Sequence, residues 1–211
     1  MIPRLPAFYP ILDVDLLVRR GIALQQYAQA LCDAGVMLLQ YRDKQGSPQQ
    51  VIRNAAIIKE VFHGSECILI LDDRADLAAL AGWDGVHVGQ QDVSPGGARK
   101  VMGTRKIIGF STHREEQVQA AEASCADYIA VGPVFTTSSK DNPDPVIGLE
   151  GVRRLRALTR KPLVAIGGIT RANCQAVIQA GADSVAVISE LLAPGAHPLQ
   201  KVAEDFLLHL R

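Results

Sequence analysis

Eight times along this 211-residue sequence, a short aliphatic run is followed by a longer segment whose apolar residues recur at helical spacing, and this repetition leaves few folds open. It is the pattern of successive βα units and of a parallel sheet. The short runs predict strands over Phe8–Leu12, Val36–Tyr41, Ile68–Asp72, Gly85–Val88, Ile107–Ser111, Tyr128–Val131, Leu163–Ile166 and Ser184–Ile188. The longer segments predict helices near Gly21–Ala34, Pro48–Phe62, Ala75–Ala81, Gly97–Met102, Arg114–Ala123, Glu150–Thr159, Arg171–Gln179 and Pro198–Leu208.

Four of the joints between a helix and the next strand carry a similar phrase, which indicates degenerate repeats of one structural unit: DAGVMLL, GWDGVHV, CADYIAV and GADSVAV. Eight units joined by right-handed crossovers can close into a barrel that has no unpaired edge strand. We therefore predict an α/β fold, a (β/α)8 TIM barrel formed as one domain by residues 1–211. The alternative is an open doubly wound sheet, but the GxGxxG fingerprint is missing after the first strand.

The charge balance restricts the partners of the chain. It has 22 basic and 22 acidic residues, so its formal net charge is zero, and no basic stripe favours nucleic acid or an anionic membrane. The apolar runs are too short to cross a bilayer, and the first residues do not resemble a signal peptide, so we expect a cytoplasmic protein. The four cysteines lie far apart and predict reduced thiols.

Polar residues follow seven of the eight predicted strands. Because catalytic residues of a TIM barrel lie in the loops after the strands, these residues predict a site for phosphate, metal or polar ligands at one end of the barrel. They are Gln40, Arg42, Asp43 and Lys44 after the second strand, Asp72, Asp73 and Arg74 after the third, Gln90 and Asp92 after the fourth, Ser111 after the fifth, Thr136, Thr137, Ser138, Ser139 and Lys140 after the sixth, Gly167 and Gly168 after the seventh, and Ser189 after the eighth.

The seventh and eighth predicted strands end in features of a phosphate site. Gly167 and Gly168 precede a predicted helix, where glycines let the backbone approach an anion and the helix dipole favours negative charge. Ile188 and Ser189 lie in the neighbouring loop, which in such barrels shares the phosphate site. The alternative is that the glycines only form a tight turn.

Asp73 and Asp92 follow adjacent strands and could share one hard cation. Mg²⁺ fits, because it takes one or two protein carboxylates and leaves its other positions to substrate phosphates and water. The alternative is that both aspartates are helix N-caps or partners of Arg74 and Arg99.

Arg42, Lys44 and Lys140 could clamp a diphosphate that is also bound to the metal. Arginine offers a bidentate fork to phosphoryl oxygens and lysine offers a point charge. Alone, either lysine would be read as a solvated loop residue, but the nearby aspartates favour the clamp.

Two histidines also lie near the predicted mouth. A structural role is favoured for His87, whereas His113, two residues beyond Ser111, either lines the pocket or caps a helix.

Taken together, these segments resemble the thiamine phosphate synthase family over nearly the whole chain. Single pieces such as GGI occur in many phosphate-binding barrels, but the ordered series is specific. The stretches are LLQYRDK, LILDDRADLA, DGVHVGQQD, IIGFSTH, DYIAVGPVFTTSSKD, GLEGVRRL, VAIGGI and SVAVIS.

The resemblance implies transfer of the 4-amino-2-methylpyrimidin-5-ylmethyl group from its diphosphate to the nitrogen of a thiazole phosphate, with release of pyrophosphate. It implies small-molecule substrates and Mg²⁺ held by Asp73 and Asp92, and a homo-oligomer is compatible with it. Matching positions assign the pyrimidine diphosphate to Gln40, Tyr41, Arg42, Asp43, Lys44, Asp72, Ser111 and Lys140. Among these, the residues given a catalytic role are Arg42, Lys44, Ser111 and Lys140. The thiazole phosphate is assigned to Thr137, Ser138, Ser139, Gly168, Ile188 and Ser189.

Three positions depart from the family pattern. Tyr41 stands where Leu is usual, Ser139 where a second Thr is usual, and Asp72 where Asn is usual. Asp72 matters most, because a carboxylate there adds negative charge beside a diphosphate. It could bind metal, bind the pyrimidine amino group, or be partly protonated through coupling with Asp73.

Two other functions compete with this transferase. One is a thiazole tautomerase, an isomerase of the same fold that uses a histidine and has no need of the full diphosphate clamp. The other is a non-catalytic sensor of phosphate ligands. We also predict that the loop over Thr136–Val146 closes over the site and excludes water.

Overall fold

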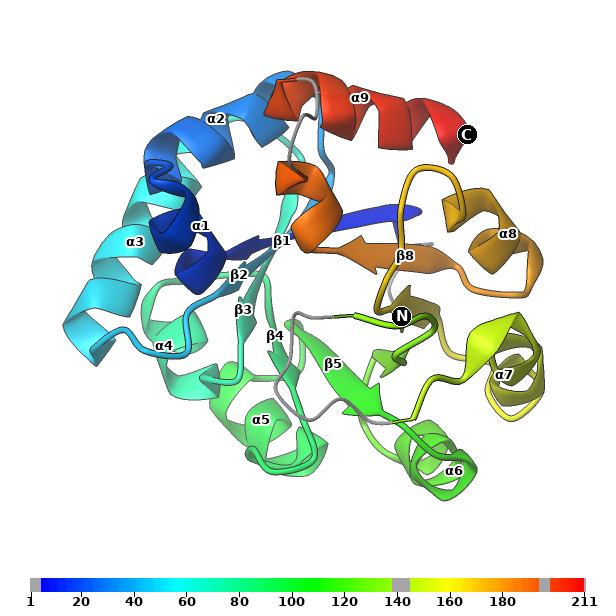
Figure 1. Cartoon of the computed structure of the whole chain (residues 1–211). Helices are drawn as coiled ribbons and strands as arrows, with labels where there is room; N and C mark the ends of the chain where they lie inside the picture. The colour runs from blue at the N-terminus through cyan, green and yellow to red at the C-terminus, as the bar shows by residue number, and fades with distance from the viewer. Residues whose placement is uncertain (1–4, 138–144, 194–197, 211) are drawn as a thin grey trace.

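The computed structural model of the chain describes residues 5–137, 145–193 and 198–210. Eight parallel strands form a closed barrel in chain order, ringed by helices (Figure 1). The strands are β1 (Phe8–Asp13), β2 (Leu38–Arg42), β3 (Ile68–Asp72), β4 (Gly85–Val88), β5 (Ile107–Thr112), β6 (Tyr128–Val131), β7 (Leu163–Ile166) and β8 (Ser184–Val187). The helices are α1 (Val14–Arg20), α2 (Leu24–Asp33), α3 (Pro48–Val61), α4 (Ala75–Leu80), α5 (Pro95–Met102), α6 (Glu115–Ala123), α7 (Gly148–Arg156), α8 (Cys174–Gln179), the 3₁₀ helix η1 (Ser189–Leu192) and α9 (Leu199–His209).

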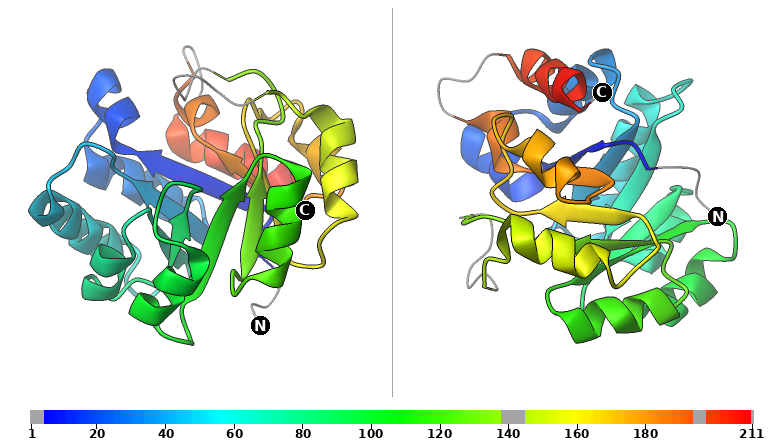
Figure 2. Two further views of the ribbon diagram at one scale, coloured as in Figure 1. Left: turned by 90° about the horizontal axis from the view of Figure 1, so that it is seen from below. Right: turned by 90° about the vertical axis from the view of Figure 1, so that its right-hand side faces the viewer.

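The sheet closes where β1 pairs with both β2 and β8. Phe8 is in register with Val185 on one side, and Ile11 is in register with Gln40 on the other. This closure confirms the predicted TIM barrel and excludes the open sheet. In both side views the strands lie inside the layer of helices (Figure 2).

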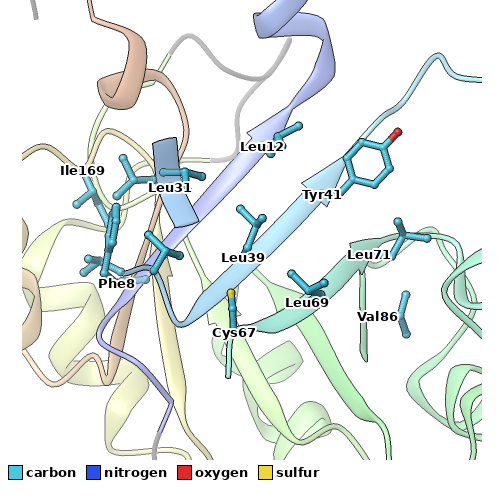
Figure 3. Close-up of a cluster of buried hydrophobic side chains, with 14 of the residues drawn as sticks. Phe8, Leu12, Leu31, Leu39, Tyr41, Cys67, Leu69, Leu71, Val86 and Ile169 are labelled. Atoms are coloured by element: carbon cyan, nitrogen blue, oxygen red, sulfur yellow. The ribbon is translucent and has the colours of Figure 1, made fainter. Parts of the chain in front are cut away.

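The two faces of each strand pack into two separate cores, because successive side chains of a strand point to opposite faces. The larger core lies between barrel and helices; Leu39, Tyr41, Leu69 and Leu71 point into it from β2 and β3 (Figure 3). The smaller core fills the barrel interior and consists of Leu5, Tyr9, Ile11, Leu38, Ile70, Tyr128, Ala130, Val164 and Ala186. Side chains that point into the barrel but lie beyond this inner core, near the carboxyl ends of the strands, therefore face the open end of the barrel.

The first helical region differs from the prediction. A helix over Gly21–Ala34 was expected, but the structure has α1 over Val14–Arg20 and α2 over Leu24–Asp33. The Asp13 side chain caps α1 by accepting from the Leu16 N–H at 2.9 Å, and Gly21 ends it in a left-handed conformation with φ of 64°. Gly21 therefore ends a helix rather than beginning one.

Three of the four repeated phrases have a common structural role at the end of the barrel where the strands begin. In each, an aspartate just before an even-numbered strand accepts a hydrogen bond from a backbone N–H of the preceding strand. Asp84 accepts from Leu69 at 3.0 Å, Asp127 from Ile108 at 2.8 Å and Asp183 from Leu163 at 2.8 Å. These contacts, which we call the aspartate stitches, join β3 to β4, β5 to β6 and β7 to β8.

Replacing Asp127 with alanine should lower the free energy of unfolding by about 1–3 kcal/mol, because the Ile108 N–H loses its acceptor and the Arg99 guanidinium loses its ion-pair partner. Denaturant unfolding measures the loss. Asp33→Ala is the control, since Asp33 accepts an exposed hydrogen bond from Gln29, and it should change stability by less than about 0.5 kcal/mol. Equal effects of the two substitutions would contradict a role for the stitch.

Within the described ranges, no helix is both long enough and apolar enough to serve as a membrane span.

Candidate active site

A cavity of about 580 Å³ opens at the carboxyl ends of the strands, and residues on or after all eight strands line it. It contains most of the side chains that the sequence predicted for one site. The predicted residues on its wall are Gln40, Arg42, Lys44, Asp72, Asp73, Gln90, Asp92, Ser111, Thr137, Gly167, Gly168, Ile188 and Ser189, together with His87 and His113.

Strand periodicity explains why these residues meet. Gln40 and Arg42 share the inward face of β2, and the inward Asp72 of β3 is in register with His87 of β4. Parallel strands end at the same edge, so side chains that follow β2, β3 and β4 gather on one side of the cavity.

Arg42 is held by acidic side chains on two neighbouring strands. It forms an ion pair with Asp13 of β1, whose other carboxylate oxygen caps α1, and its Nε lies 3.6 Å from Asp72 Oδ2. The Arg42 side chain retains 19% of its exposure. These contacts orient the guanidinium while part of it still faces the cavity.

Lys44 connects the two aspartates that follow β3. Its Nζ lies 3.5 Å from Asp72 Oδ2 and forms an ion pair with Asp73. Burial alone would lower the pKa of Lys44, but the charges of Asp72 and Asp73 raise that pKa above the ordinary value for lysine. Lys44 therefore remains a cation.

Asp72 is the most strongly perturbed carboxyl group of the site. Burial, followed by the charge of Asp73, raises the pKa of Asp72 to about 7, against the opposing effects of Lys44 and Arg42. Near neutral pH this residue thus exists partly as a neutral acid, which resembles in charge the asparagine that is usual there.

Asp73 and Asp92 lie close enough to interact directly. Burial raises the pKa of Asp73, and the adjoining Asp92 carboxyl raises it further, while Lys44 lowers it. Asp92 also accepts from the Gly89 N–H at 2.7 Å, which holds its loop against the site. Two carboxylates brought together in this way favour a bound cation.

The contacts do not support the structural alternative for these aspartates. Arg74 pairs with Asp76 and Arg99 pairs with Asp127, while the N-cap of α5 is Ser94. No group of three or more His, Cys, Asp or Glu side chains suited to a metal occurs in the described part of the chain. The pair Asp73 and Asp92 is therefore compatible with a cation that takes its remaining ligands from substrate and water.

The opposite side of the cavity is formed by the loops after β6, β7 and β8. Gly168 has a φ of 63°, and a Cβ there would lie 2.5 Å from the Thr136 carbonyl oxygen. A helix follows these glycines as predicted, but α8 begins at Cys174 rather than near Arg171, so five residues separate it from Gly168. Ser189 instead begins the short helix η1, which places its backbone at the cavity.

Two predicted residues point away from the cavity. Tyr41 lies on the outer face of β2, among the side chains of the larger core (Figure 3). Its ring is 5.9 Å from the Trp83 ring, and its hydroxyl donates to Asp43 and accepts from Asn54. The Asp43 carboxylate accepts from the Gly46 N–H at 2.7 Å and so shapes its own loop. Ser138, Ser139, Lys140 and the central part of the predicted closing loop lie outside the described residues.

Both histidines line the cavity and bond to its walls. His87 bonds through Nδ1 to the Tyr128 hydroxyl at 2.9 Å and through Nε2 to the Ser111 hydroxyl at 2.7 Å. His113 bonds through Nδ1 to the Gly132 carbonyl oxygen at 2.7 Å, and its backbone N–H donates to Gln117. His87 thus has the structural contacts that were favoured for it.

The sequence did not reveal three residues that support the site: Asp13, Tyr9 and Tyr128. Asp13 had a usable signal, because an aspartate before VDLLVRRG has the pattern of a helix cap and stop. Tyr9 and Tyr128 had none, because 119 positions separate them.

Comparison with known proteins relates the chain to one family. The model of the thiamine monophosphate synthase family matches residues 8–191. The thiamine-phosphate synthase of Koribacter versatilis is 51% identical over 203 residues, which cover 95% of this chain and 94% of that protein. The thiamine-phosphate synthase of Caldicellulosiruptor bescii is 37% identical over 186 residues, covering 88% and 84%. The solved thiamine phosphate pyrophosphorylase from Pyrococcus furiosus superposes with a TM-score of 0.84 at 30% identity, over 96% of this chain and 94% of that one.

Proposed function

Because the chain belongs to the thiamine monophosphate synthase family, we propose that the cavity at its barrel mouth binds the two substrates of a thiamine-phosphate synthase in adjoining halves. The enzyme transfers the 4-amino-2-methylpyrimidin-5-ylmethyl group from its diphosphate to the nitrogen of a thiazole phosphate and releases pyrophosphate. One observation carries the two-half arrangement. Basic and acidic side chains gather after β2 to β4, whereas glycine-rich backbone and hydroxyl groups gather after β6 to β8.

In the first half, the residues after β2 and β3 bind the diphosphate. The bond between the methylene carbon and the diphosphate oxygen breaks, and its electron pair leaves with pyrophosphate. Arg42 and Lys44 lower the energy of this step by stabilising the negative charge that develops on the leaving group. Asp13 and Asp72 hold Arg42 in position, so little reorganisation accompanies the reaction. We propose the same role for Lys140, which follows β6 in the sequence.

Asp73 and Asp92 would hold Mg²⁺. Burial and the nearby Asp92 carboxyl raise the pKa of Asp73. A bound cation would offset the repulsion between these two carboxylates. When bound, the cation would neutralise the diphosphate as a leaving group.

In the second half, the thiazole phosphate binds against the backbone of Gly168, Ile188 and Ser189 and the Thr137 side chain. Backbone N–H groups in glycine-rich turns and at strand ends suit a phosphate, and Gly168 lets it approach closely. The thiazole nitrogen then donates its lone pair to the methylene carbon and forms the new C–N bond. Binding both substrates in one cavity makes this step effectively intramolecular.

The isomerase alternative is not favoured. An enzyme that only moves a proton on the thiazole phosphate has no use for a diphosphate site, yet Arg42, Lys44, Asp73 and Asp92 line the cavity here. We further propose that residues 1–211 act as a single catalytic domain.

One assay tests the function directly. The purified protein is incubated with both substrates and Mg²⁺, and thiamine phosphate and pyrophosphate are measured against an authentic synthase. We expect both products in equal amounts, with no thiamine phosphate when the thiazole phosphate is omitted and greatly reduced turnover in excess chelator. Absence of product under conditions in which the authentic enzyme is active would disprove the proposal.

Replacing Asp72 with asparagine should change kcat/KM by less than about threefold, because its ion-pair distances of 3.5 and 3.6 Å are long and its raised pKa already favours a neutral group. Steady-state kinetics with each substrate varied in turn measures this. Asp72→Ala, which removes the hydrogen-bonding group, should be more harmful than Asp72→Asn. A large loss in Asp72→Asn would instead indicate metal binding or a required negative charge.

A further inference from the structure

A chain of hydrogen bonds crosses the barrel interior at the floor of the cavity. It runs from Gln40 Nε2 to the Tyr9 hydroxyl at 3.1 Å, to the Tyr128 hydroxyl at 3.0 Å, to His87 Nδ1 at 2.9 Å, and from His87 Nε2 to the Ser111 hydroxyl at 2.7 Å. We call these five residues the interior relay. They come from β2, β1, β6, β4 and β5, and all of them except Tyr128 line the cavity, including both ends, Gln40 and Ser111.

Packing fixes the middle of the relay. Tyr9 and Tyr128 are 1% and 0% exposed, and the His87 ring stacks on Tyr128 with centroids 5.5 Å apart. Gly109 makes this arrangement possible, because a Cβ there would lie 2.1 Å from the Tyr128 ring and 2.5 Å from His87 Nδ1. The rings therefore have little room to exchange partners.

The relay has a direction. An amide nitrogen can only donate, so Tyr9 accepts from Gln40. The Tyr9 hydrogen is buried and needs an acceptor, and the Tyr128 oxygen at 3.0 Å supplies one, so Tyr9 donates to Tyr128. Burial raises the pKa of both phenols, so both keep their hydrogens. Tyr128 then donates to His87 Nδ1, which leaves the ring hydrogen on Nε2, where it is donated to the Ser111 oxygen.

The direction determines what the two ends offer to a ligand. Gln40 uses its amide nitrogen in the relay and retains its carbonyl oxygen, an acceptor. Ser111 accepts from His87 and retains its hydroxyl hydrogen, a donor. One wall of the cavity thus carries an acceptor and another carries a donor.

We propose that Tyr9, Tyr128 and His87 are positioning residues that set this polarity, and that the polarity selects an aminopyrimidine. Such a ring has an amino donor beside a ring-nitrogen acceptor, which match Gln40 and Ser111. The 4-oxo analogue has an acceptor beside an N–H donor and is therefore mispaired at both. Sites built around buried hydrogen bonds reject mispaired ligands strongly. This inference rests on the proposed pyrimidine half of the cavity.

The Tyr128→Phe variant tests the proposal, because it keeps the ring and removes the link. Without that hydroxyl, the His87 tautomer and the Gln40 amide can reverse, so the preference for the amino substrate over its 4-oxo analogue, as a ratio of kcat/KM, should fall at least about 10-fold. The KM for the pyrimidine diphosphate should rise, while the KM for the thiazole phosphate should not. Tyr27→Phe, which removes a buried hydroxyl from the outer core, is the control and should keep the parent ratio.

A second variant and an NMR measurement complete the test. If Tyr128→Phe does not fold, Tyr9→Phe breaks the preceding link and should lower the same ratio. Independently of turnover, the ¹⁵N shifts of His87, assigned with the His87→Asn variant, should report hydrogen on Nε2. Hydrogen on Nδ1, or an unchanged ratio in the folded tyrosine variants, would overturn the proposal. If the unsubstituted protein makes no thiamine phosphate, that result counts against the proposed function. The His87 tautomer, measured from its ¹⁵N shifts, would still test the interior relay.

Discussion

The Asp73→Asn variant is expected to have a kcat/KM about 100-fold lower than the parent and to need more Mg²⁺ for half-maximal activity. Asp73 has a φ of 59°, a left-handed conformation that asparagine tolerates as well as aspartate does. Its backbone N–H, which donates to the His87 carbonyl oxygen at 2.7 Å, is unchanged by the substitution. The variant therefore removes charge without adding backbone strain, and titration of activity with Mg²⁺ measures the effect.

Asp76→Asn is the matched control for this prediction. Asp76 lies three positions further along, on the exposed start of α4, where it pairs with Arg74. It should retain the activity and Mg²⁺ dependence of the parent. If Asp73→Asn also retained both, the metal assignment would be wrong.

The Gly168→Ala variant is expected to raise the KM for the thiazole phosphate and to lower kcat/KM by about 100-fold, with little change in pyrimidine diphosphate binding. The added Cβ would lie 2.5 Å from the Thr136 carbonyl oxygen and 2.8 Å from the Phe135 Cβ, so the loops after β6 and β7 must separate. Steady-state kinetics with each substrate varied in turn, together with calorimetric binding of the pyrimidine diphosphate, distinguishes the two halves.

The Gly21→Ala variant separates the effect of the steric clash from the energetic cost of a left-handed backbone conformation. Gly21 has a φ of 64°, almost the same as the 63° of Gly168, but a Cβ there would meet no atom within 4 Å. Both variants should lose about 1–2 kcal/mol of stability from the left-handed conformation. Only Gly168→Ala should lose activity, and an equal loss in both variants would contradict a specific role for the β7 loop.

The fold could be predicted from the sequence because each strand is a short aliphatic run bounded by turn residues. Four of the eight predicted strands, beginning with Ile68–Asp72 and Gly85–Val88, have the bounds that the structure gives them. The error at Gly21 arose where two short helices follow one another, because apolar spacing alone does not reveal which glycine ends a helix. The Asp13 cap was the missing signal.

Only part of the candidate site could be predicted from the sequence. Alternation along β2 separates the inward Gln40 and Arg42 from the outward Tyr41, but a motif match treats all three alike. The contacts of Arg42 with Asp13, and of Tyr9 with Tyr128, depend on which strands become neighbours and on side-chain packing. Closure of the barrel brings together residues whose separation along the chain carries no such information.

The aspartate stitches and the cavity lie at opposite ends of the same strands. Each stitch joins an odd-numbered strand to the even-numbered strand that follows, and none of the three aspartates lines the cavity. Strand register is thereby determined independently of the loops that perform the chemistry. Such a molecule is open to evolutionary change, because new substrates can be accommodated by altering one rim of the barrel while its assembly is preserved from the other.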